Sequence, residues 1–174
     1  GECQALTSGY FPAYPYLIWF LESIGLHNKL IPIFISILAV SSIIYLLLTL
    51  YRINLGEGKI YSLALFLGFS PVGFGYSRYL LIEPTLYIFS ILLLAEFINL
   101  KINPKNFKYI FFRVTILSLI SIFLKPTAIL LITPHFLIIL INYGIKKFIK
   151  TFLIFSLILC FSIIPWSFRD GGIG

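Results

Sequence analysis

An acidic and a basic side chain stand close together between two apolar runs of this sequence. Arg78 precedes Glu83 by five residues, and Pro84 follows Glu83 directly. Because Pro suits the first position of a helix, Glu83 is expected at a helix N-terminus, where the helix dipole stabilises a carboxylate. Such a pair at a membrane surface can hold a metal ion, an anionic head group or a reacting hydroxyl. The simpler interpretation is a helix cap with a surface ion pair.

A second cation, Lys125, interrupts a long apolar stretch and is followed by Pro126 and Thr127. Pro ends a helix at the residue before it, so a new helix is expected to begin here, with Lys125 beside its free N–H groups. Both attract anions, which makes this a candidate phosphate site. A charge within an apolar run is costly and is a functional candidate by default. The alternative is a lysine that extends to the external head groups.

Three further ionisable residues lie within or beside apolar runs. His135 follows Pro134, which is expected to kink its helix, and a packing or pore-lining role is favoured because no acidic or second His partner stands at helical spacing. Glu96 is expected near the cytoplasmic end of its helix, in contact with solvent. Arg113 is expected to extend to the same surface.

The composition identifies the class of protein to which these residues belong. The chain has 174 residues, of which 60% are hydrophobic and 11% charged, and its mean hydropathy is +1.03. Soluble domains are about 45–50% apolar and about 25% charged. A soluble globular protein, a disordered chain and a basic nucleic-acid-binding domain are therefore excluded. The prediction is an all-α, polytopic transmembrane bundle, and the lack of Met leads us to expect a piece of a longer protein.

Runs of apolar residues locate the helices, since about 20 such residues cross the hydrocarbon layer. Six spans are predicted, several of them short or broken: 30–51, 60–74, 84–100, 109–124, 126–143 and 152–166. Residues 1–29 are expected to form an external loop with a juxtamembrane helix at the interface, rich in Tyr and Trp. Residues 167–174 are expected to begin the next external loop.

The distribution of Lys and Arg orients these spans. Alternating the loops puts nine basic residues on one side and four on the other, and the richer side is expected to be cytoplasmic. The four external basic residues are Lys29, Arg78, Lys125 and Arg169. The prediction is therefore a multi-pass protein of the plasma (inner) membrane, with its chemistry on the external, periplasmic face.

Four short motifs occur in an order that resembles the integral-membrane GT-C glycosyltransferases, the broad family of protein O-mannosyltransferases and lipid A aminoarabinose transferases. The motifs are the Pro-Ala-Tyr-Pro-Tyr-Leu stretch at 12–17, Tyr-Ser-Arg at 76–78 with Glu83-Pro84, Lys-Pro-Thr at 125–127 with Pro134, and Pro-Trp-Ser-Phe-Arg-Asp at 165–170. Ala13 stands where a second Pro is usual, and Asp170 stands in place of Asn. The family's acidic residue after the first membrane helix is not in this stretch, so the fragment is not expected to be active alone.

The resemblance implies a reaction. A sugar carried on a polyprenyl phosphate, rather than on a nucleotide, is transferred to a protein, lipid or glycan acceptor at the external face. Glu83 is the implied catalytic residue, which positions the acceptor or binds a divalent metal ion. The residues implied to neutralise the departing phosphate are Arg78, Lys125 and Arg169.

The resemblance further implies that three tyrosines line the cavity, namely Tyr14, Tyr16 and Tyr76. The partners implied are the lipid-linked donor, the acceptor and membrane lipid, with no nucleic acid. A different class of protein, a fragment of a multi-pass transporter or flippase, stays an alternative, because broken helices and an intramembrane Lys occur there too.

Overall fold

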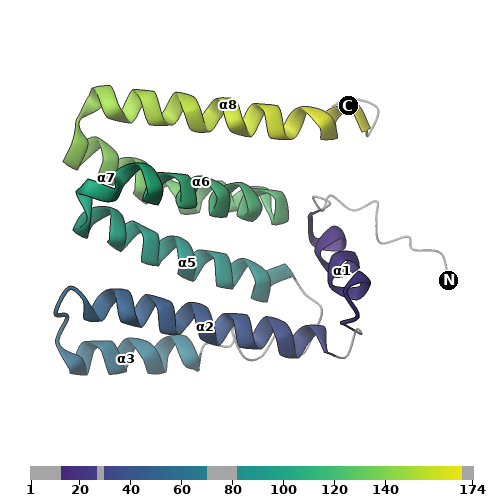
Figure 1. The fold of residues 1–174 in the computed structure, drawn as a ribbon, viewed down its shortest axis with the longest axis horizontal. Helices are drawn as coiled ribbons and strands as arrows, with labels where there is room; N and C mark the ends of the chain where they lie inside the picture. Colours follow the sequence, from purple (N-terminus) through teal and green to yellow (C-terminus); the bar gives the residue numbers. More distant parts are fainter. Residues whose placement is uncertain (1–12, 27–29, 70–81, 170–174) are drawn as a thin grey trace. The chain divides into compact units, whose positions relative to one another are not determined.

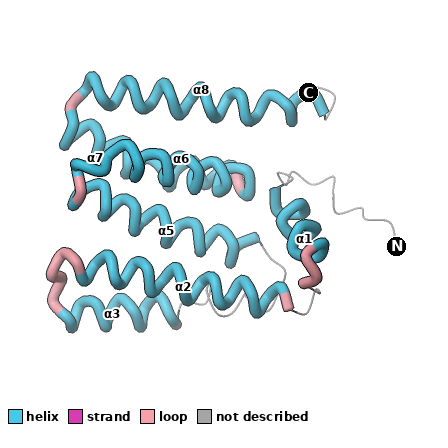
Figure 2. Tube along the Cα trace, viewed as in Figure 1, coloured by secondary structure: helices cyan, strands magenta, loops and turns pink. Residues whose placement is uncertain are grey.

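The computed structural model describes residues 13–26, 30–69 and 82–169 (Figure 1). All regular structure within these ranges is helical, which confirms the predicted all-α class (Figure 2). In chain order the elements are α1 (Ala13–Ser23), α2 (Ile31–Tyr51), α3 (Glu57–Gly68), α5 (Ile82–Ile102), the short 3-10 helix η2 (Pro104–Asn106), α6 (Phe107–Leu124), the 3-10 helix η3 (Pro126–Ile132), α7 (Thr133–Tyr143) and α8 (Ile145–Arg169).

Three helices in the described part of the chain are long and apolar enough to cross a membrane. They are Ile31–Tyr51, Glu83–Ile102 and Pro104–Leu124, with 21, 20 and 21 residues. At about 1.5 Å per residue each measures about 30 Å, the thickness of the hydrocarbon layer. The predicted count of six spans is not confirmed. α3 has only 12 residues, and the stretch 126–143 is divided between η3 and α7.

The chain divides into two compact units, residues 1–132 and 133–174, and each is described by itself. In the first unit α5 lies between α2 and α6, with α3 against α2 and η3 against α6 (Figure 1). Leu46 and Leu50 of α2 pack on Ile91 and Ala95 of α5 in one core cluster. α5 is therefore the central helix of this unit.

Several polar side chains of these apolar helices are satisfied locally, although the buried hydroxyls of Thr85 and Ser118 have no hydrogen-bond partner. Several hydroxyl groups donate a hydrogen bond to the carbonyl four residues earlier in the same helix: those of Ser36, Ser41, Ser90, Thr115 and Ser121. Large apolar side chains also cover much of the outer surface, among them Ile37, Ile44 and Leu48 of α2. Internal satisfaction of polar groups and an apolar exterior are what a lipid environment requires.

α1 forms where the sequence predicts a juxtamembrane helix. Leu21 is buried and packs with Ile31, Ile35 and Ile88, so α1 is held at the end of α2 and α5 where Ile31 and Glu83 lie. Trp19, Phe20 and Ile24 are exposed. One side of α1 thus contacts the bundle, while apolar and aromatic side chains cover another.

The second unit contains α7 and α8. Gly144, with φ of +80°, ends α7, because L-residues with a side chain rarely adopt that conformation. Phe136 packs edge-on against Phe148, Phe152 and Phe155 of α8. Pro134, which is predicted to kink a helix, is the second residue of α7, where its missing N–H is not needed.

Candidate functional site

The structure brings together two residues that the sequence singles out in separate motifs. Glu83 lies in the first turn of α5, and Lys125 lies at the junction between α6 and η3. The helix η3 packs against both α5 and α6. The Nζ atom of Lys125 is 3.9 Å from Oε1 of Glu83. An acid and a base that are 42 positions apart in the chain therefore share one site at one end of the α5–α6 pair.

The backbone at Lys125 explains its position. Its N–H donates to the carbonyl of Ser121 at 2.9 Å and completes α6, while its own carbonyl accepts from the N–H of Ala128 at 2.9 Å and begins η3. Between these bonds the residue is extended, with φ −151° and ψ 119°. Pro126 requires this, because the residue before a proline is disfavoured in the helical region. The predicted break at Lys125 is thus confirmed.

The Glu83–Lys125 contact is weak as an ion pair. The two side chains are 46% and 42% exposed, and 3.9 Å is a long separation. Exposed pairs contribute about 0–1 kcal/mol to stability. The fold therefore depends little on this pair, and both charges are accessible to solvent.

The other predicted site residues lie wholly or partly outside the described part of the chain. Tyr76 and Arg78 lie outside the described residues. Tyr14 and Tyr16 belong to α1, and Arg169 is the last residue of α8 in the other unit, but the side chains of these three are likewise outside the described part. Their roles stay predictions.

The described residues do not fit a metal ion at Glu83. Among them no group of three His, Cys, Asp or Glu side chains lies close enough together to hold one. The ammonium group of Lys125 also stands against the Glu83 carboxylate, where it supplies the positive charge that a metal ion would bring. No step of the chemistry is therefore assigned to a metal.

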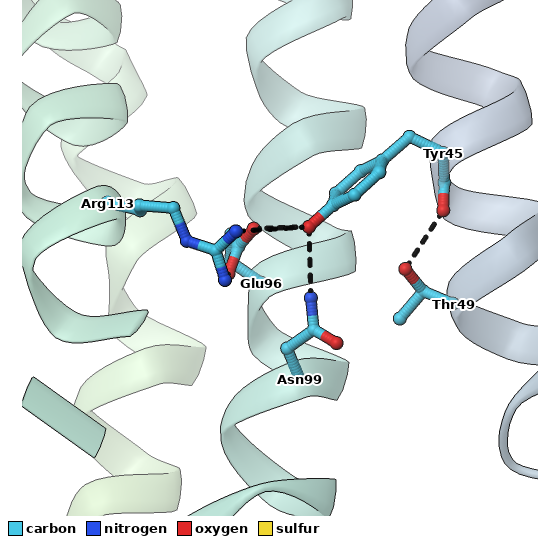
Figure 3. A network of polar contacts seen from close by, with 5 residues as sticks. All are labelled: Tyr45, Thr49, Glu96, Asn99 and Arg113. Atoms are coloured by element: carbon cyan, nitrogen blue, oxygen red, sulfur yellow. Dashed lines mark hydrogen bonds and ion pairs between the residues drawn. The ribbon is translucent and has the colours of Figure 1, made fainter. Parts of the chain in front are cut away.

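A second charged cluster lies within the helices, and the sequence analysis missed it. Oε2 of Glu96 on α5 is 2.9 Å from Nη2 of Arg113 on α6 (Figure 3). The alignment falls outside hydrogen-bond geometry, so the contact is chiefly electrostatic. Tyr45 of α2 completes the cluster, since its hydroxyl donates to Oε1 of Glu96 at 2.8 Å.

Three further contacts fix Tyr45 and Arg113. Asn99 donates from Nδ2 to the Tyr45 hydroxyl oxygen at 3.2 Å, and Arg113 donates to the same oxygen from Nη1 at 3.4 Å (Figure 3). The ring of Tyr109 lies under the guanidinium group, 4.7 Å from Cζ. We call Tyr45, Glu96, Asn99 and Arg113 the inner cluster. It joins α2, α5 and α6.

The prediction that Glu96 contacts solvent is wrong. Glu96 is 2% exposed and pairs with Arg113. The Arg113 side chain is 34% exposed, and its guanidinium group contacts the buried Glu96. A signal for this pairing was present in the sequence. Four residues connect α5 to α6, and Glu96 precedes the end of α5 by as many residues as Arg113 follows the start of α6. On antiparallel neighbours, equal distances from the turn bring two side chains level.

Removing one partner costs more free energy in the inner cluster than in the Glu83–Lys125 pair. Breaking a buried ion pair by removing one partner costs about 3–5 kcal/mol, because the other charge is left without compensation. Near the centre of a membrane helix an ionised Arg or Asp costs about 2.5–3.5 kcal/mol. Glu96 and Arg113 therefore need each other, whereas Glu83 and Lys125 do not.

Comparison of the chain with protein-family models, with curated proteins and with solved structures found no match. The function is therefore inferred from the residues and contacts described above.

Proposed function

We propose that this chain is part of a membrane glycosyltransferase that moves a sugar from a polyprenyl-phosphate carrier to a protein, lipid or glycan acceptor at the external membrane face. The observation that carries the proposal is the 3.9 Å approach of Lys125 Nζ to Glu83 Oε1. It unites two motifs whose order along the chain resembles that of the GT-C transferases. The half-exposed state of both side chains supports a site that is open to substrate.

In the proposed reaction Glu83 and Lys125 have different roles. The Glu83 carboxylate accepts the proton of an acceptor hydroxyl as the hydroxyl oxygen attacks the anomeric carbon of the sugar. The bond from that carbon to the phosphate oxygen breaks, and the polyprenyl phosphate leaves with the bonding electrons. Lys125 stabilises the negative charge that develops on the phosphate. Arg78 and Arg169, which the resemblance implies in the same task, would add positive charge.

The surroundings suit a lipid-linked donor. The helices that carry the pair, α5 and α6, are both long and apolar enough to cross a membrane, and Glu83 lies at the first residue of its apolar segment. A phosphate placed beside Lys125 would be at a helix end, while an apolar polyprenyl chain could extend along the helices. Multi-pass insertion with this end external is part of the proposal and follows from the distribution of Lys and Arg.

The test is sugar transfer by the full-length protein carrying Glu83→Gln. Membranes with the variant are supplied with a radiolabelled polyprenyl-phosphate sugar, and transfer to endogenous acceptor is measured. Loss of a general base lowers the rate about 10²–10⁴-fold. The matched control is Glu57→Gln, since Glu57 is also an exposed acid in the first turn of a helix, α3.

Two results would contradict the proposal. One is transfer by the Glu83→Gln protein at the rate of the Glu57→Gln control. The other is movement of the lipid-linked sugar across the bilayer without any transfer, which would favour the flippase alternative.

A further inference from the structure

Two acid–base pairs join α5 to α6, one at the end of the interface where α5 begins and one within the helices, six residues from the connection between them. α5 supplies the acid in both, Glu83 and Glu96, and the α6 segment supplies the base in both, Lys125 and Arg113. The acids are 13 residues apart and the bases 12 residues apart. These spacings correspond to about 20 Å and about 18 Å of helix. The same antiparallel register therefore satisfies both pairs.

The two pairs differ in their power to set that register. Glu96 is buried, it contacts Arg113 at 2.9 Å, and its other carboxylate oxygen is held by Tyr45 of a third helix. A slip of one helical turn, about 5.4 Å, would leave a buried charge without its partner. The Glu83–Lys125 pair is long and exposed, so it cannot resist such a slip.

We propose that Glu96 and Arg113, together with Tyr45, are positioning residues for the external site. They fix the axial register of α5 against α6, and that register places Glu83 opposite Lys125. The functional meaning of this proposal rests on the proposed transferase site, but the register itself does not. Neither Glu96 nor Arg113 touches substrate in this scheme, because both lie more than three helical turns from Glu83 and Lys125.

The test measures the register directly in the full-length protein within its membrane. Glu83→Cys and Lys125→Cys are combined in a background without other cysteines, which includes Cys3→Ser and Cys160→Ser, and a short bifunctional thiol reagent reports their proximity. Glu96→Gln or Arg113→Gln should lower the cross-linked fraction about threefold or more, since the first leaves the part-buried Arg113 and the second leaves the buried Glu96 without its partner. Exchange of the two charges, Glu96→Arg with Arg113→Glu, should restore most of it.

Two controls separate register from stability. Ser121→Ala removes a buried hydroxyl of α6 that bonds only within its own helix, to the carbonyl of Leu117, so cross-linking should not change. Tyr45→Phe keeps the ring and removes only the hydroxyl, which allows a folded protein to be tested even where Glu96→Gln does not accumulate. Cross-linking in Tyr45→Phe should fall less than in Glu96→Gln.

The outcomes are distinct. Unchanged cross-linking in Glu96→Gln and Arg113→Gln, or a charge exchange that recovers nothing, would overturn the positioning role. Sugar transfer is measured in parallel with Glu83 and Lys125 intact, and it should fall and recover with the cross-linked fraction. If cross-linking depends on the Glu96–Arg113 pair but the wild-type protein transfers no sugar, the positioning role stands and the proposed function fails.

Discussion

Glu96 and Arg113 stand at equal distances from the connection between α5 and α6, and their Oε2 and Nη2 atoms lie 2.9 Å apart. Each residue is the partner that makes the other acceptable inside apolar helices. Each of α5 and α6 therefore carries a charge that the other helix neutralises. This dependence leads to the first prediction.

Replacing only one of Glu96 and Arg113 should destabilise the protein more than replacing both. Arg113→Met leaves the buried Glu96 uncompensated and should cost about 3–5 kcal/mol, whereas Glu96→Met with Arg113→Met should cost much less, since apolar replacement of a whole buried pair is often neutral. The free energy of unfolding in detergent micelles, measured as a double-mutant cycle, gives the coupling. Additive costs of the two substitutions would contradict the pairing.

Lys125→Met should separate activity from stability. The Glu83–Lys125 pair is exposed and long, so the free energy of unfolding should change by less than about 1 kcal/mol. Sugar transfer should fall about 10²–10³-fold, the usual effect of losing one group that stabilises developing negative charge. Lys101→Met is the control, because Lys101 is exposed at the opposite end of α5 and should affect neither quantity. Equal activity of the two variants would rule out the assigned role of Lys125.

The exposed side of α1 should lie in the membrane interface. The chain has two Trp residues, so Trp166→Phe leaves Trp19 as the only one, and Trp19 is exposed on α1. Lipids brominated near the head group should quench its fluorescence more strongly than lipids brominated near the chain end, since Trp prefers the interface. Stronger quenching from the chain end, or none, would show that α1 lies elsewhere.

Gly144→Ala should destabilise the protein through the backbone alone. Gly144 has φ of +80°, and an added Cβ would meet no atom within 4 Å. The left-handed conformation costs an L-residue about 1–2 kcal/mol, which should appear as a lower melting temperature. Gly58→Ala is the matched control: its added Cβ also meets no atom within 4 Å, it lies within α3, and Ala favours a helix by about 1 kcal/mol over Gly. A higher melting temperature for Gly144→Ala would be unexpected.

The parts of the fold that depend on local sequence could be predicted. The apolar runs located α2, α5 and α6 to within a few residues, and Pro126 located the break after α6. What hydropathy cannot give is the pairing of helices. It therefore could not show that Glu83 and Lys125 meet, whereas the equal distances of Glu96 and Arg113 from the short connection carried a signal for their pairing.

The error at Glu96 has a specific cause. Its place near the end of the predicted run 84–100 indicates that Glu96 can reach the interface, but the place of a residue along a helix does not decide which side of the helix faces a neighbour. The apolar run predicts one span over 126–143 because hydropathy alone does not distinguish 3-10 from α-helical backbone. The change to an α-helix at Thr133 is not visible in such a pattern.

The central position of α5 also restricts how the Glu83–Lys125 site can move. Thirteen residues correspond to about 140° around a helix, so Glu83 and Glu96 point in different directions. Turning α5 about its axis would pull Glu96 away from Arg113 and Tyr45 together. Lys125, in contrast, sits on a single extended residue between two helices. Of the two charges at the site, Glu83 therefore lies on the helix whose rotation the inner cluster opposes, whereas Lys125 lies at a helix junction.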